Sequence, residues 1–300
     1  MNSKKANRAF LITVVCYLLI VFCVANFAPT LADNFFVSNL LIEAIVILPI
    51  GVVICFSKEK LIPFLGFRKM KIKTVLMTAL FTGLSIPFIT LLNLISQIWV
   101  KNEVTTIIES MDTSQSLVFT LFVPAAVVAP FAEEITCRGM YYHAYKKTGG
   151  ALKAMLLSAL IFAMIHMNLN QAMYAFGMGI LSVLLMEATG SLWASILYHG
   201  LINGSQSMLM MAMLKANPNI YSEQAELVTT DTVLFGIGVY LIIAAVTLPL
   251  AWAVLIWMSG HEGRREEFRE IWTIKKDKTI TGSLILGLIL CVLMMTGILF

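Results

Sequence analysis

Long apolar stretches follow one another along this chain, and short polar segments separate them. A helix needs about 20 apolar residues to cross the hydrocarbon core of a membrane. Stretches of roughly this size occupy residues 10–28, 40–56, 74–100, 116–146, 151–167, 171–188, 192–213, 233–258 and 281–299. The pattern therefore predicts an all-α, polytopic transmembrane helix bundle with about eight or nine membrane helices.

The composition agrees with a membrane protein and excludes several other classes. Of the 300 residues, 59% are hydrophobic and 13% are charged, and the mean hydropathy is +0.87. A typical soluble domain carries about 25% charged residues. The charge is therefore too low for an ordinary globular protein, a disordered chain or a nucleic-acid binder. The five cysteines are scattered without CxxC spacing, which excludes a disulfide framework and a zinc ribbon.

The distribution of basic residues predicts the orientation of the chain. If the N-terminus is cytoplasmic, all lysines and arginines except Lys101 and Lys215 lie in cytoplasmic segments. Such an excess of positive charge on one side is typical of cytoplasmic loops. The basic residues on that side include Lys4, Lys5, Arg8, Lys58, Lys60, Arg68, Lys69, Arg138, Lys146, Lys147, Lys153, Arg264 and Arg265. We expect the first apolar stretch to be a retained anchor rather than a cleaved signal peptide.

Three parts follow from the pattern. Residues 1–115 hold N-terminal membrane helices, 116–213 the helices with the polar motifs, and 214–300 C-terminal helices joined by a charged cytoplasmic connector at 259–279. We expect this connector to be solvated. The alternative is that it lies on the inner leaflet through Phe268, Ile271 and Trp272.

Ionisable side chains inside predicted membrane helices need a reason, because each costs at least about 2.5–3.5 kcal/mol to insert. The ionisable residues are Glu43, Glu133, Glu134, Arg138, His166, Glu187 and His199, and the amide residue Asn203 follows His199 by four positions. Glu187 falls at a helix end, and for Glu43 we expect a shallow position near the outer interface. His143 and His261 fall in cytoplasmic segments, where we expect ordinary surface residues.

Helical spacing and depth sort the motif residues. Glu134 and Arg138 are four residues apart, as are Phe162 and His166, and His199 and Asn203, so each pair shares a helix face. Counting 1.5 Å per residue from the cytoplasmic lysines puts Glu133 and His166 about 20 Å above the same interface, and His199 and Asn203 about 12–18 Å above it. Four polar groups from three helices thus fall in one layer of the membrane.

A carboxylate and an imidazole in this layer can act as general base, and a second imidazole and an amide can stabilise an oxyanion. Glu133, His166 and His199 could instead hold a zinc ion with an activated water, and the spacing does not choose between the two. No cofactor is certain from the sequence, and zinc remains open. The structural alternative is a polar network that only holds helices together.

The order of the three motifs resembles the CPBP family of intramembrane proteases, which includes type II CAAX prenyl endopeptidases, lysostaphin-resistance-like proteins and bacteriocin-processing proteins. The matching letters are EExxxR at Glu133, FxxxH at Phe162 and HxxxN at His199, within residues 117–208. A basic turn, Leu65-Gly66-Phe67-Arg68-Lys69, is a less specific similarity. Cys137 stands where the family usually has an aromatic residue, which is not one of the fixed motif positions.

The resemblance implies roles for these residues. Glu133 and His166 would activate the water, and His199 and Asn203 would stabilise the oxyanion. Glu134, Arg138 and Phe162 would support the site. It also implies an integral multi-pass protein, expected in a bacterial cell membrane, with the lipid bilayer and a membrane-associated peptide or protein substrate as its partners and no nucleic acid. Two rivals remain: a non-proteolytic scaffold of the same fold, and a proton-coupled transporter that uses Glu133 and His166 as a relay.

Overall fold

The structure is a computed structural model that describes residues 1–32, 35–56, 61–102, 116–217, 220, 228–276 and 278–299. Lys58 and Lys60 lie outside the described residues, as does most of the two loops that follow Lys101 and Lys215. All regular elements within the described ranges are helical, so the predicted all-α bundle is confirmed.

The elements before the motifs are α1 (Ser3–Phe27), α2 (Pro29–Ala32), α3 (Phe35–Phe56), α4 (Leu61–Leu65) and α5 (Ile72–Ser96). The motif region contains η1 (Val118–Phe122), η2 (Pro124–Val128), α7 (Ala129–Glu134), η3 (Ile135–Tyr142), α8 (His143–Ile165), α9 (Leu169–Thr189) and α10 (Leu192–Ala216). The last elements are α12 (Thr230–His261), α13 (Arg265–Arg269), η4 (Glu270–Trp272) and α14 (Gly282–Met295).

Five of the described helical stretches are long and apolar enough to cross a membrane. They are Ser3–Phe27, Ile72–Ser96, Val118–Ile165, Leu169–Thr189 and Thr230–His261, and two shorter apolar helices lie at Phe36–Pro49 and Gly282–Met295. The protein is therefore an integral membrane helix bundle. The number of spans, their orientation and the three-part division of the chain stay predictions.

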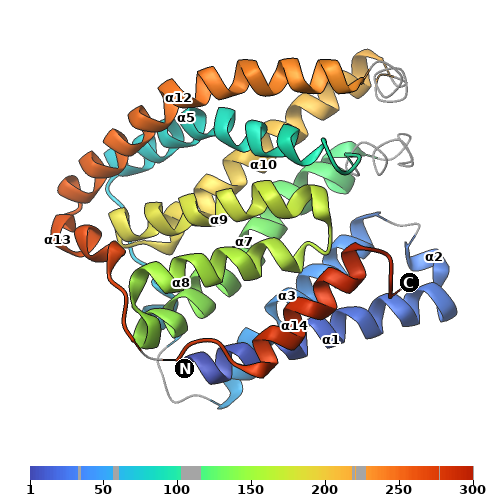
Figure 1. Cartoon of the computed structure of the whole chain (residues 1–300), viewed down its shortest axis with the longest axis horizontal. Helices are drawn as coiled ribbons and strands as arrows, with labels where there is room; N and C mark the ends of the chain where they lie inside the picture. Colours follow the sequence, from blue (N-terminus) through green and yellow to red (C-terminus); the bar gives the residue numbers. More distant parts are fainter. Residues whose placement is uncertain are drawn as a thin grey trace.

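The motif helices lie in the middle of the bundle. In Figure 1, α8 and α9 run between a pair formed by α5 and α12 and a group formed by α1, α3 and α14. Burial follows this order: 72% of the most apolar segment of α9 is buried, against 17% for α1 and 22% for α12. The outer helices therefore present their apolar side chains outward, whereas the central helices pack against protein on most sides.

The predicted spans 116–146 and 151–167 correspond to two helical segments within Val118–Ile165 that meet at a non-helical kink. The backbone breaks at Gly150, whose φ is +82°. A Cβ at this position would lie 2.6 Å from the Thr273 carbonyl oxygen, so glycine is required there. The stretch before α8 is largely π-helical in η1, η2 and η3, a rare geometry that is often found at functional sites.

The connector at 259–279 is docked on the bundle, so the expectation of a solvated segment is wrong. Phe268 and Ile271 are buried, whereas Trp272 is exposed. The Leu152 amide donates to the Thr273 carbonyl at 3.2 Å, and the Lys275 amide donates to the Gly149 carbonyl at 3.0 Å. These bonds hold the connector against the Gly150 turn, a contact between distant parts of the chain that local patterning does not reveal.

Candidate active site

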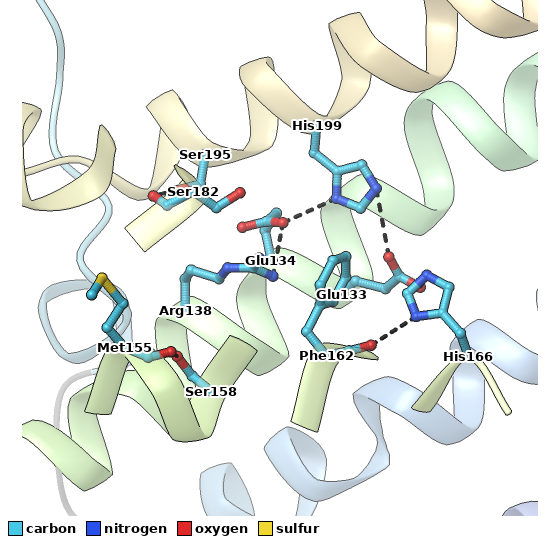
Figure 2. Close-up of polar contacts among 10 residues, drawn as sticks. All are labelled: Glu133, Glu134, Arg138, Met155, Ser158, Phe162, His166, Ser182, Ser195 and His199. Atoms are coloured by element: carbon cyan, nitrogen blue, oxygen red, sulfur yellow. Dashed lines mark hydrogen bonds and ion pairs between the residues drawn. The ribbon is translucent and has the colours of Figure 1, made fainter. Parts of the chain in front are cut away.

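Short turns with defined caps position the site helices. α8 ends at Ile165 with His166 as its C-cap, and the chain then turns at Met167, whose φ of +49° is unusual for a residue with a side chain. Asn168 caps the next helix by accepting a hydrogen bond from the Gln171 amide, and Ser191 caps α10 in the same way. These turns bring His166 and His199 next to the two motif glutamates of α7 (Figure 2).

Glu134, Arg138 and His199 form a buried ion-pair network. The Glu134 Oε1 atom lies 3.0 Å from Arg138 Nη1 and 3.0 Å from His199 Nδ1 (Figure 2). The glutamate and the arginine are fully buried, and His199 is 2% exposed. The ion pair predicted from the four-residue spacing is therefore present. An unpaired charge is costly at this depth. The Glu134 carboxylate and the Arg138 guanidinium are tolerated here because each neutralises the other.

Glu133 lies between the two imidazoles without a direct bond to either. Its Oε1 atom is 4.0 Å from His166 Nε2, and its Oε2 atom is 3.6 Å from His199 Nε2. Both distances exceed a normal N···O hydrogen bond of about 2.7–3.2 Å. The Glu133 side chain is 10% exposed and that of His166 is 15% exposed, so this face of the site is the more accessible one. The structure thus brings Glu133, His166 and His199 together.

The second ring nitrogen of each histidine has a fixed partner. His166 Nδ1 lies 2.7 Å from the Phe162 carbonyl oxygen, which can only accept, so this nitrogen donates. His199 Nδ1 donates to Glu134 in the same manner. These partners leave both Nε2 atoms facing Glu133 (Figure 2). A neutral imidazole in this tautomer presents a basic Nε2 lone pair to the space beside the carboxylate.

Phe162 contacts three members of the site. Its ring packs edge-on against His166, with centroids 4.9 Å apart, and against His199 at 5.6 Å. The Arg138 guanidinium carbon lies 4.2 Å from the same ring centroid. Phe162 is 1% exposed. One aromatic side chain therefore sets the orientation of both imidazoles and of the arginine, through edge-to-face and cation–π contacts.

Asn203 is joined to a different element. Its Nδ2 atom donates to the Ala125 carbonyl oxygen at 2.9 Å. A Cβ on Gly200 would lie 2.9 Å from the Ala126 carbonyl oxygen, so α10 passes very close to η2 here. The spacing predicted that His199 and Asn203 point at one spot. That expectation stays a prediction; the amide also ties α10 to the segment that leads into α7, so one amide N–H is already in use.

The zinc alternative has little geometric support. Over the residues that the structure describes, no group of three or more His, Cys, Asp or Glu side chains is arranged to hold a metal ion. His199 Nδ1 is held by Glu134, so only Nε2 of this ring faces Glu133. No step below is therefore routed through a metal.

Several polar residues lie elsewhere than expected. Glu43 is 7% exposed, so it is buried against other helices, and its expected shallow depth stays a prediction. His143 is half-buried, donates from Nδ1 to the Gly139 carbonyl at 2.8 Å and contacts Phe64, so it is no ordinary surface residue. Glu187 lies at a helix end as predicted, but it is buried. Cys137 is a free, buried thiol.

Comparison with known proteins identifies the family of the motif region. The family model described as "Type II CAAX prenyl endopeptidase Rce1-like" matches residues 115–205. No curated protein and no solved structure gave a significant match. The resemblance predicted from the three motifs is thus confirmed over this segment. It supports a membrane protease with a peptide or protein substrate.

Proposed function

We propose that this protein is an intramembrane endopeptidase that hydrolyses a peptide bond of a membrane-associated protein or peptide through a water activated by Glu133 and His166. The observation that carries the proposal is the position of the Glu133 carboxylate, 3.6 and 4.0 Å from two imidazole nitrogens supplied by separate helices. Gaps of this size between polar groups are suited to a bridging water.

The first step uses the groups that face this gap. Glu133 and the basic Nε2 of His166 accept a proton from the water, and the resulting hydroxide attacks the carbonyl carbon of the substrate. The bond from His166 Nδ1 to the Phe162 carbonyl keeps the ring in the tautomer that can accept this proton. No covalent intermediate with the protein is needed.

The oxyanion is stabilised on the other side of the gap. His199 can donate from Nε2 only when both of its nitrogens carry hydrogen, and its Nδ1–H is held by Glu134 at 3.0 Å. Arg138 offsets the charge of Glu134 in turn. Asn203 contributes its remaining amide N–H. Removal of one oxyanion donor costs roughly 10²–10³ in rate, so Asn203→Ala should keep a measurable residue of activity.

The substrate follows from the location of the site. Glu133 lies within Val118–Ile165, a stretch long and apolar enough to cross a membrane, and His166 directly follows it, so the scissile bond has to be presented at membrane depth or at its edge. Membrane-associated precursors, such as peptide pheromone or bacteriocin precursors, fit this requirement. A scaffold of the same fold would have no need for an unbonded carboxylate between two imidazoles.

The test uses purified protein in detergent and a panel of membrane-anchored fluorogenic peptides. Wild type is compared with Glu133→Gln, which is close to isosteric, and with Glu187→Gln as a matched change of a buried carboxylate outside the site. Each is assayed with and without a strong zinc chelator. Cleavage that requires Glu133 and survives chelation supports the proposal. Cleavage that the chelator abolishes would indicate that a metal, rather than the Glu133–His166 pair, activates the water. Equal rates for wild type and Glu133→Gln would contradict the proposal.

A further inference from the structure

Glu43 is a buried carboxylate in the membrane part of α3 with an oxygen that lacks a partner. Glu43 is 7% exposed, and its Oε2 atom has no hydrogen-bond partner among the described residues. An isolated carboxylate at membrane depth is costly, and such residues usually mark function. The described part of the structure shows no basic side chain paired with it that would explain its retention.

The packing of α3 places Glu43 level with the catalytic layer. The Thr136 hydroxyl donates to the Val46 carbonyl at 3.1 Å, which fixes the register between α3 and the α7–η3 segment. Leu65, in α4 after α3, packs against Gly139, which follows Thr136, so the chain after Val46 and the chain after Thr136 lead toward the same end of the bundle. Glu43 is three residues before Val46, and Glu133 is three residues before Thr136. The two carboxylates therefore lie at the same height, on facing helices.

This register has an electrostatic consequence. Two carboxylates at one height on packed helices repel each other when both are ionised. Glu134 adds a third carboxylate nearby, but its charge is balanced by Arg138 at 3.0 Å. Two neighbouring carboxylates in a poorly solvated site cannot both be ionised without a large cost, so the pair retains one proton.

Peptide hydrolysis needs a proton donor for the leaving nitrogen, and either the protonated Glu133–His166 pair or a separate acid can fill this role. Glu133 and His166 take up the proton of the water, and His199 and Asn203 donate to the oxyanion. The leaving nitrogen of an amide has to be protonated before the C–N bond breaks. We propose that Glu43 is a further catalytic residue, which delivers a proton from its carboxyl group to the leaving nitrogen of the substrate. This inference rests on the proposed endopeptidase function.

The proton balance closes without another reactant. Water loses a proton to Glu133 and His166, and its oxygen forms the new bond to the carbonyl carbon. The Glu43 carboxyl gives its proton to the nitrogen as the C–N bond breaks, and the products are an amine and a carboxylic acid. The proton held by Glu133 and His166 then returns to Glu43, which restores the starting state.

The experiment compares two substrates that share the same acyl part. One is a peptide amide, and the other is the matching ester of a nitrophenol, whose leaving group departs without protonation. For Glu43→Gln we expect the rate on the amide to fall about 10²–10⁴-fold, the usual range for loss of a general acid or base. The rate on the ester should change little, so the ester-to-amide rate ratio rises by about two orders of magnitude or more.

The controls separate this inference from the proposed function. Glu133→Gln should lose activity on both substrates, because both need the activated water. If it does so while Glu43→Gln slows ester and amide equally, the acid role of Glu43 is wrong and the protease stands. If Glu133→Gln is fully active on both substrates, the proposed function itself fails.

A second variant guards against loss of fold. Glu43→Met removes the acid and also the buried, unpartnered carboxylate, so it should be at least as stable as wild type. It should give the same rise in the ester-to-amide ratio as Glu43→Gln. An unchanged ratio in this variant would overturn the inference. Monodispersity in detergent and thermal unfolding establish that each variant is folded.

Discussion

Two buried glutamates, Glu187 and Glu133, differ in how completely the protein bonds them. Glu187 is 4% exposed, and its Oε1 accepts hydrogen bonds from the Tyr142 hydroxyl at 3.0 Å and from Lys146 Nζ at 2.6 Å. Arg264 Nε donates to its backbone carbonyl at 3.0 Å. Glu133 has 3.6 and 4.0 Å contacts to two imidazoles, and no hydrogen bond joins its carboxylate to another described residue.

The difference separates a structural carboxylate from one that is free to react. The bonds of Glu187 join α8, α9 and the segment after α12 at the predicted cytoplasmic end of the bundle, around a cavity of about 120 Å³. Glu133 contributes little to cohesion, because its neighbours are themselves held by the Phe162 carbonyl and by Glu134. Bonded partners that hold a site in place, and a central group left unbonded, are the arrangement that preorganised catalysis requires.

The largest expected effect tests this difference directly. Glu133→Gln should reduce cleavage by about 10²–10⁴-fold, as for loss of a general base, without lowering the unfolding temperature. Glu187→Gln should leave the rate per folded molecule unchanged and should lower the free energy of unfolding by about 1 kcal/mol, because a charge-assisted bond to Lys146 is lost. Peptide cleavage and thermal unfolding of both variants check this. An active Glu133→Gln protein would remove the distinction.

The next effect concerns the buried ion pair. Arg138→Met should lower the free energy of unfolding by about 3–5 kcal/mol, because it leaves Glu134 buried with one fewer cation. The double variant Glu134→Gln/Arg138→Met should recover part of this loss, since neither charge remains. The free energy of unfolding in mixed micelles measures both. Equal stability of single variant and wild type would show that Arg138, fully buried in the structure, is not required by Glu134.

A smaller effect is expected at Phe162, which orients the groups without taking part in the chemistry. Phe162→Leu removes the edge-on contacts to His166 and His199 and should reduce the catalytic rate about tenfold, since small displacements of reacting groups are costly. Phe81→Leu is the matched control, because Phe81 is also fully buried but its ring packs against Tyr198, with centroids 5.4 Å apart, rather than against a site histidine. Similar losses of stability with a rate loss confined to Phe162→Leu would sharpen the comparison; equal rates would contradict it.

Sequence patterning anticipated those parts of the site that depend on a single helix. The four-residue spacing predicted the Glu134–Arg138 pair and the Phe162–His166 contact, and counting residues from the basic loops brought Glu133, His166 and His199 to one layer. These predictions hold because helical rise and turn are fixed by backbone geometry.

The remaining parts depend on packing between helices. The Asn203 bond to Ala125 arises because the chain is π-helical after Pro124, which regular α-helical spacing does not anticipate. The Thr136 bond to Val46 fixes the register of α3 and with it the height of Glu43, and the connector docks because Thr273 meets the Gly150 turn. No local pattern encodes such contacts between distant segments.

The smallest effect tests how tightly the Glu187 cluster is built, through two glycines with the same backbone conformation. Gly190 and Gly263 both have φ of +71°. A Cβ on Gly190 would lie 2.6 Å from the Arg264 Cδ atom, whereas a Cβ on Gly263 would meet nothing within 4 Å. Each alanine variant should lose about 1–2 kcal/mol of stability from backbone strain alone. Gly190→Ala should lose more than Gly263→Ala, because Arg264 has to move away from the Glu187 carbonyl. Thermal unfolding of the two variants gives the difference. The rate per folded molecule should stay at the wild-type value in both variants. Equal losses of stability would mean that Arg264 adjusts freely and that the Glu187 cluster is looser than its bonds indicate.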